Sequence, residues 1–175
     1  MRVVAALLAL VVVAGCGGDP EPKEPKSVPT ASTTPTATPP TMPAQAKENS
    51  PEGAAAFVKH YIDVFNYASN TGDVTELSRL SSPKCDGCQR YIKLFRDTYA
   101  AGGYFKDSGW KIVDSKVESD TSAFSITTSI RAPETEYRMK SDGEVKVGEA
   151  GHYDLAFELS ASHRILALTQ VEEKR

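Results

Sequence analysis

The sequence predicts an α+β domain in which helices come first and antiparallel strands follow. Between Ser50 and Gly103, apolar residues recur at steps of three and four, the spacing of helices with one buried face. After Gly109, apolar residues alternate with polar ones, as in half-buried strands. Because the helices precede the strands as one block, we expect them on one face of the sheet. The prediction is three N-terminal helices packed on a curved antiparallel sheet of about five to six strands.

The first helix is expected to begin after Ser50. Ser50 is a good N-cap, and Pro51 suits the first helical position because an N–H there would have no helical partner. Gly72 suits the left-handed position that ends a helix. The apolar face of this helix comprises Ala54, Phe57, Val58, Tyr61, Ile62, Phe65 and Ala68.

Two shorter helices are expected next. Asp73 and Glu76 have the spacing of a capping box and start the second helix, which residues 81–83 (Ser-Ser-Pro) interrupt. A third helix follows from about Asp86 and stops at the glycine pair 102–103.

The strands are predicted from alternation and from one turn. The first strand alternates imperfectly around Val113 and Asp114, and residues 141–143 (Ser-Asp-Gly) indicate a hairpin turn. The last strand carries apolar residues on both faces, which suggests a central or covered strand. The predicted strands span about 110–118, 124–130, 137–139, 145–147, 153–159 and 164–171.

The N-terminus predicts export and lipid anchoring. A single Arg2 precedes an apolar run and the tetrapeptide 13–16 (Val-Ala-Gly-Cys), the pattern of a bacterial lipoprotein signal peptide over residues 1–15. The apolar run is too short for the roughly 20 residues of a transmembrane helix. We therefore expect lipid on Cys16 and an extracytoplasmic protein anchored to the cell membrane. An ordinary secretory signal with a chance cysteine is the alternative.

Residues 16–49 differ in composition from the rest of the chain. Proline, threonine, serine and alanine dominate this segment, which contains no aromatic residue. Such a composition buries too little apolar surface to offset the entropy of ordering, so a disordered tether is predicted. Residues 50–175 are then one globular domain.

The charge balance argues against nucleic acid as a partner. The chain carries 20 Lys and Arg against 23 Asp and Glu, a formal net charge of −3, without a basic cluster. A strongly basic membrane-binding surface is disfavoured for the same reason.

Cys85 and Cys88 are predicted to form a disulfide, because the exported chain would lie in an oxidising compartment. A redox-active pair is a second interpretation, since a helix N-terminus lowers the pKa of a cysteine placed there. Half of a zinc site is a third, but zinc needs four ligands. His60, His152 and His163 are too scattered to complete such a site. We expect neither a metal nor another cofactor.

Several short segments carry a family resemblance. They are Ser50-Pro51-Glu52-Gly53-Ala54, Asn66-Tyr67-Ala68, Thr71-Gly72-Asp73, Leu80-Ser81-Ser82-Pro83 and Cys85-Asp86-Gly87-Cys88, followed by Gly102-Gly103 and Trp110. These segments resemble an actinobacterial lipoprotein family of unknown function, domain-of-unknown-function family 6318. The resemblance implies a lipid-anchored surface protein and supplies no catalytic residues.

The order of elements also resembles the cone of the nuclear-transport-factor-2-like (SnoaL-like) superfamily, with cystatin-like folds as the neighbouring alternative. That resemblance implies a concavity between the first helix and the sheet, which often holds an apolar ligand. Five residues are the candidates for lining such a pocket, with tyrosine and asparagine as its polar groups. They are Tyr61, Phe65, Asn66, Tyr91 and Trp110.

No catalytic set is evident in the sequence. Asp114 and Asp154 are only weak candidates for a buried acid or base. We therefore predict a non-catalytic domain that binds a small apolar ligand or an envelope protein. The alternatives are a small isomerase- or dehydratase-like enzyme on the same cone, and a purely structural envelope lipoprotein.

Overall fold

The computed structural model describes residues 37–119, 123–160 and 162–171. The described residues form a short 3₁₀ helix, three α-helices and then seven strands, which confirms the predicted α+β class. The helices are η1 (Ala44–Lys47), α1 (Pro51–Thr71), α2 (Thr75–Leu80) and α3 (Asp86–Ala100). The strands are β1 (Tyr104–Lys106), β2 (Lys111–Ser119), β3 (Ala123–Ala132), β4 (Thr135–Arg138), β5 (Lys146–Gly148), β6 (Gly151–Ser160) and β7 (Ile165–Val171).

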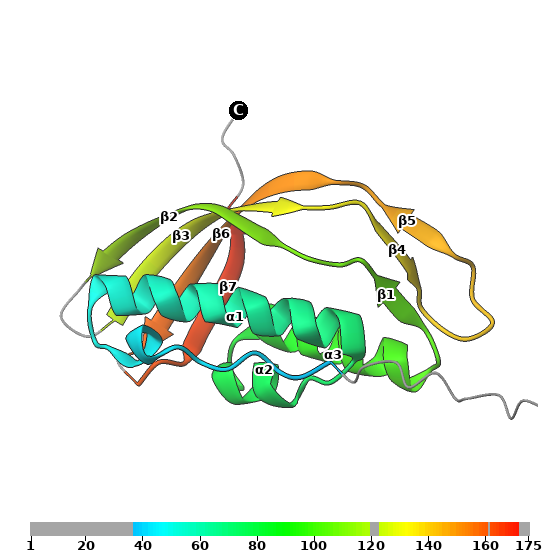
Figure 1. Ribbon diagram of the computed structural model, residues 1–175, viewed down its shortest axis with the longest axis horizontal. Helices are drawn as coiled ribbons and strands as arrows, with labels where there is room; N and C mark the ends of the chain where they lie inside the picture. Colours follow the sequence, from blue (N-terminus) through cyan, green and yellow to red (C-terminus); the bar gives the residue numbers. More distant parts are fainter. Residues whose placement is uncertain (1–36, 120–122, 161, 172–175) are drawn as a thin grey trace, which may run out of the picture. The chain divides into compact units, whose positions relative to one another are not determined.

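The strands form two antiparallel sheets. The larger sheet has the order β2-β3-β6-β7 and the smaller one the order β1-β4-β5. Short links join β1 to β2, β3 to β4 and β5 to β6, so the small sheet continues the large one across a bend (Figure 1). Pro133 lies in the β3–β4 link, where a residue without an N–H cannot extend the hydrogen-bonded ladder. Helix α1 contacts β1, β2 and β3, and therefore spans both sheets.

Helix α1 begins and ends as the sequence predicts. The Ser50 hydroxyl accepts a hydrogen bond of 3.0 Å from the backbone N–H of Gly53. Gly72 adopts a left-handed φ of 76°, and its N–H donates to the carbonyl of Ala68. The predicted apolar face of α1 is buried, with Phe57 and Val58 wholly inaccessible to solvent. These caps satisfy backbone groups that a helix end otherwise leaves unpaired.

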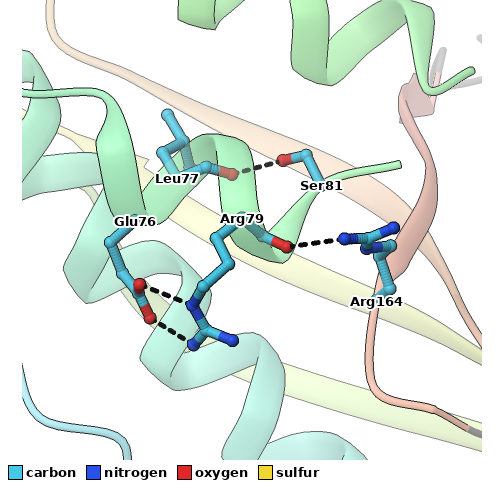
Figure 2. Close-up of polar contacts among 5 residues, drawn as sticks. All are labelled: Glu76, Leu77, Arg79, Ser81 and Arg164. Carbon is cyan, nitrogen blue, oxygen red and sulfur yellow. Dashed lines mark hydrogen bonds and ion pairs between the residues drawn. The ribbon is translucent and has the colours of Figure 1, made fainter. Parts of the chain in front are cut away.

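Helix α2 begins after its N-cap residue Val74, and the preceding Asp73 carboxylate accepts from the N–H of Thr75 at 3.0 Å. The other half of the predicted capping box is wrong. The Glu76 carboxylate binds the Arg79 guanidinium, with Nε to Oε2 at 2.7 Å and Nη2 to Oε1 at 2.5 Å (Figure 2). Arg164 donates to the Arg79 carbonyl at 3.4 Å and so ties the end of α2 to the start of β7 (Figure 2).

A β-bulge explains the imperfect alternation of the first predicted strand. The register between β2 and β3 shifts between Ile112 and Asp114, so Val113 is an extra residue on β2. Strand β3, by contrast, pairs without interruption with β6 from Ala123 opposite Ser160 onward. Its even-numbered residues from 124 to 132 are buried, as the alternation predicts.

Strand β7 is neither central nor covered on both faces, so that prediction is wrong: Ile165 and Leu168 are buried, while Leu166 and Val171 are 39% and 42% exposed. It lies at the edge of the large sheet and contacts α3. The approach is close at Gly87, where an added Cβ would lie 2.0 Å from the carbonyl oxygen of Leu168. Only a glycine leaves room for β7 at this position of α3.

The packed domain begins before Ser50, so part of the predicted tether is wrong. Residues Ala44–Lys47 form η1, which packs on α1, and Ala46 is fully buried. Met42 also packs against the core. The signal peptide, Cys16 and the tether as far as residue 36 lie outside the described residues. Within the described residues, no helix is both long and apolar enough to cross a membrane.

Candidate functional site

A cleft of about 370 Å³ lies where the two sheets meet above α1 and α3. All three links between the sheets contribute to its wall, through residues such as Trp110, Pro133 and Glu149. The bend between the sheets therefore creates the cleft. Its seven aromatic residues are Phe65, Tyr91, Phe95, Phe105, Trp110, Tyr137 and Tyr153.

The aromatic rings of the wall pack against one another in an extended cluster. Phe65 stacks on Trp110 with ring centroids 4.4 Å apart, and Tyr91 meets both rings edge-on at 4.9 and 5.6 Å. On the other side of the cleft, Phe105 of β1 stacks on Tyr137 of β4 at 5.8 Å. Offset and edge-to-face pairs of this kind add stability beyond burial alone, so the rings of the wall stabilise one another.

Asn66 of α1 fixes the position of Trp110. Its side-chain amide donates to the Trp110 carbonyl at 2.9 Å and accepts from the Trp110 N–H at 2.8 Å. One turn further along α1, the hydroxyl of Ser69 donates to the hydroxyl of Ser108 at 2.7 Å. The β1–β2 link is thus fastened to α1 by side chains, because its backbone pairs with neither sheet.

None of the three tyrosine hydroxyls in the cleft has a hydrogen-bond partner among the described residues. They belong to Tyr91 of α3, Tyr137 of β4 and Tyr153 of β6. Burial raises the pKa of the Tyr91 hydroxyl, and nearby Tyr153 adds to this rise while the charge of Arg90 opposes it. The Tyr91 phenol therefore stays neutral at physiological pH, and a tyrosine hydroxyl without a partner can donate or accept a hydrogen bond.

Three of the five predicted pocket residues line this cleft: Phe65, Tyr91 and Trp110. Tyr61 does not, because its side chain is 1% exposed in the core and its hydroxyl lies 3.0 Å from the Ser81 hydroxyl. Burial raises the pKa of Tyr61 to about 12. Asn66 stands behind the wall and acts through the backbone of Trp110.

Phe105, Tyr137 and Tyr153 also line the cleft, although the sequence did not indicate them as pocket residues. Phe105 belongs to a three-residue strand between Gly103 and Gly109, too short to show an alternating pattern. Tyr137 and Tyr153 do lie on predicted strands. Only the pairing of the small sheet and its bend bring these rings to the same cleft as α3.

The structure contains a disulfide between Cys85 and Cys88. Cys85 is the N-cap of α3, and its sulfur accepts from the N–H of Cys88 at 3.2 Å. The two residues are 1% and 0% exposed. Because thiol–disulfide exchange requires access to a sulfur atom, this burial favours a structural disulfide over a redox-active one.

The three histidines lie apart from one another, and the described residues hold no cluster of His, Cys, Asp or Glu suited to a metal. His60 is buried on α1, and burial lowers its pKa. His152 accepts from the Arg131 guanidinium at 3.2 Å, and His163 contacts the backbone carbonyl of Glu48 at 3.0 Å.

The two weak acid–base candidates do not line the cleft. Asp154 is exposed on the outer face of the large sheet, where it accepts from the Ser129 hydroxyl at 2.6 Å. Asp114 is also exposed and lies opposite Ser129 from the other side. The prediction that either is a buried acid or base is wrong, because both point away from the core. Among the described lining residues, Glu149 alone carries a formal charge, and it is exposed.

The fold and the cleft define a small α+β domain with a bent sheet, a long crossing helix and an aromatic concavity between them. The family of unknown function DUF6318 matches residues 27–165, and the chain belongs to this family. No curated protein matches the sequence.

Solved structures are similar to this chain in fold. The intermembrane space region of the chloroplast protein ARC6 is 10% identical, with a TM-score of 0.51, over 71% of this chain and 98% of that one. The Kfla4162 protein from Kribbella flavida is 15% identical, with a TM-score of 0.46, over 70% and 92%. An NTF2-like protein of unknown function from Exiguobacterium sp. 255-15 is 14% identical, with a TM-score of 0.41, over 68% and 99%.

Proposed function

We propose that this protein is a non-catalytic binding protein whose cleft holds a small, largely apolar ligand. The observation that carries the proposal is the aromatic wall with three tyrosine hydroxyls that have no partner within the described residues: those of Tyr91, Tyr137 and Tyr153. Ligand sites are typically apolar concavities of about 300–1,000 Å³ with a few placed polar groups, and this cleft falls within that range.

We also propose that lipid on Cys16 anchors the domain to the cell membrane, facing away from the cytoplasm. The pattern at residues 13–16 supports this part of the proposal. A Cys16→Ser variant should appear in the medium instead of the membrane fraction. Retention of that variant by the membrane would contradict lipidation at this residue.

Native mass spectrometry of the protein purified from its own host tests the binding function. A small molecule of constant mass that copurifies with the protein is expected. Gly148→Leu is the blocking variant: a Cβ at this residue has ordinary contacts at 3.7 and 3.8 Å, and one of them is the Tyr137 ring in the cleft. A larger side chain there should fill the cleft and remove the bound mass.

Val147→Leu is the matched control. Val147 is the neighbouring residue on β5 and 59% exposed, and successive strand residues face opposite sides. This variant should retain the ligand. If the wild-type protein carries no ligand, and if the Gly148 and Val147 variants bind added small molecules equally, the cleft is not a binding site.

A further inference from the structure

The chemistry of the cleft wall indicates the charge of its ligand. Seven of the seventeen residues that line the cleft are aromatic, and the single formal charge among them is that of Glu149. Aromatic faces carry negative electrostatic potential, and they attract cations placed within about 6 Å of the ring centre. The aromatic wall and the Glu149 carboxylate therefore both favour a positively charged ligand.

We infer that the cleft selects a small organic cation, an amine or quaternary ammonium attached to an apolar body. This inference rests on the proposed binding function and specifies its ligand class. The positively charged group would lie between the Glu149 carboxylate and the tyrosine rings, and the apolar body would lie against Phe65 and Trp110.

The polar groups at the cleft agree with this assignment. The carboxylate of Glu149 only accepts hydrogen bonds, and the hydroxyls of Tyr91 and Tyr153 can accept as well as donate. No lysine or arginine side chain lines the cleft among the described residues. An anionic ligand would therefore give up its hydration without meeting a counter-charge, and such desolvation is costly.

Cations close to the cleft lie outside its wall. Arg90 precedes Tyr91 and is exposed on α3. Lys111 and Arg131 are exposed, pair across β2 and β3, and border the adjoining hollow rather than the aromatic cleft. Glu149 is exposed too, so solvent screens all of these charges, but Glu149 alone lies in the wall itself and is therefore the charge that a bound group would meet.

The test uses the fluorescence of Trp110, the single tryptophan of the chain, which lies in the cleft wall. The purified full chain is titrated with three probes of similar shape: benzyltrimethylammonium, its neutral isostere neopentylbenzene, and benzylsulfonate. The cation is expected to bind about tenfold more tightly than the neutral probe, because a desolvated cation–π contact supplies about that factor. The anion is expected to bind more weakly than either.

Two carboxylate variants separate the role of the cleft from general surface charge. Glu149→Gln should weaken the cation about threefold, the scale of an exposed ion pair, and leave the neutral probe unchanged. Glu144→Gln removes an exposed carboxylate that does not line the cleft, and it should change neither affinity.

The outcomes distinguish this inference from the function on which it rests. Equal affinity for the cation and its neutral isostere, or an unchanged cation affinity in Glu149→Gln, overturns the cation assignment and leaves a binding cleft in place. If none of the three probes changes the fluorescence of Trp110, both the inference and the proposed binding site fall.

Discussion

Asn66→Ala tests whether one side chain positions the cleft wall. The variant removes both hydrogen bonds to the Trp110 backbone, at 2.9 and 2.8 Å, and leaves that N–H and carbonyl without a protein partner. Each such bond contributes about 0.5–1.5 kcal/mol net, so the free energy of unfolding should fall by about 1–3 kcal/mol. Trp110 should also become more mobile, and the cleft should lose affinity for its probes.

Urea unfolding followed by circular dichroism measures the first effect without depending on the tryptophan itself. Asn49→Ala is the control, because Asn49 is exposed and its side chain makes no hydrogen bond within the described residues. Its effect should stay within about 0.5 kcal/mol. If Asn66→Ala changes the free energy of unfolding as little as Asn49→Ala does, Trp110 is held by ring packing alone and the reasoning from the two hydrogen bonds is wrong.

Three further predictions concern stability. The buried His60 has no partner at Nε2, and burial lowers its pKa. Below pH about 6.5 the unfolded chain therefore binds more protons than the folded one, so the free energy of unfolding should fall on acidification. In urea titrations at pH 7.5, 6.5 and 5.5, the His60→Leu variant should lose less stability between these pH values than the wild type. Gly87→Ala should lower the free energy of unfolding by about 1–3 kcal/mol or more, because the new Cβ would lie 2.0 Å from the Leu168 carbonyl oxygen of β7. Gly109→Ala is the control and should be near neutral, because a Cβ there has no neighbour within 4 Å. Equal melting temperatures for the two variants would contradict the argument. Replacing Cys85 and Cys88 together by alanine should cost about 2 kcal/mol, and the native oxidised protein should show no titratable thiol among these two residues, before or after denaturation.

The helices could be predicted closely because their signals are local. Ser50, Pro51 and Gly72 lie within one turn of the helix ends that they define, and the structure places those ends as expected. The same holds for Asp73, whose carboxylate accepts from the first N–H of the helix that follows it. A capping residue needs only its own neighbours in the chain, so tertiary structure does not alter the outcome.

The cleft could be predicted only in part, because its walls meet through long-range contacts. Tyr61 and Phe65 share one face of α1, and the sequence treats them alike. The bend between the sheets places Phe65 at the cleft, while Tyr61 lies deeper and pairs with Ser81. Which ring faces a cavity depends on where the sheet curves, and no local pattern in the sequence specifies that position.

The N-terminal limit of the domain could not be predicted from composition, for a similar reason. Composition marks residues up to 49 as tether, since prolines and small polar residues dominate there. Yet two isolated apolar residues, Met42 and Ala46, are enough to dock the last part of this segment on α1. A composition averaged over some thirty residues does not reveal two residues that pack against the core.

The contact between Glu48 and His163 has a mechanical consequence. The His163 ring donates to the Glu48 carbonyl at 3.0 Å, joining residues 115 positions apart in the chain. A pull on the chain from its N-terminal side would thus load the turn between β6 and β7 together with η1 and α1. The residues just before α1 are thereby tied to the turn that joins the last two strands of the large sheet, and these strands brace the N-terminal edge of the packed domain.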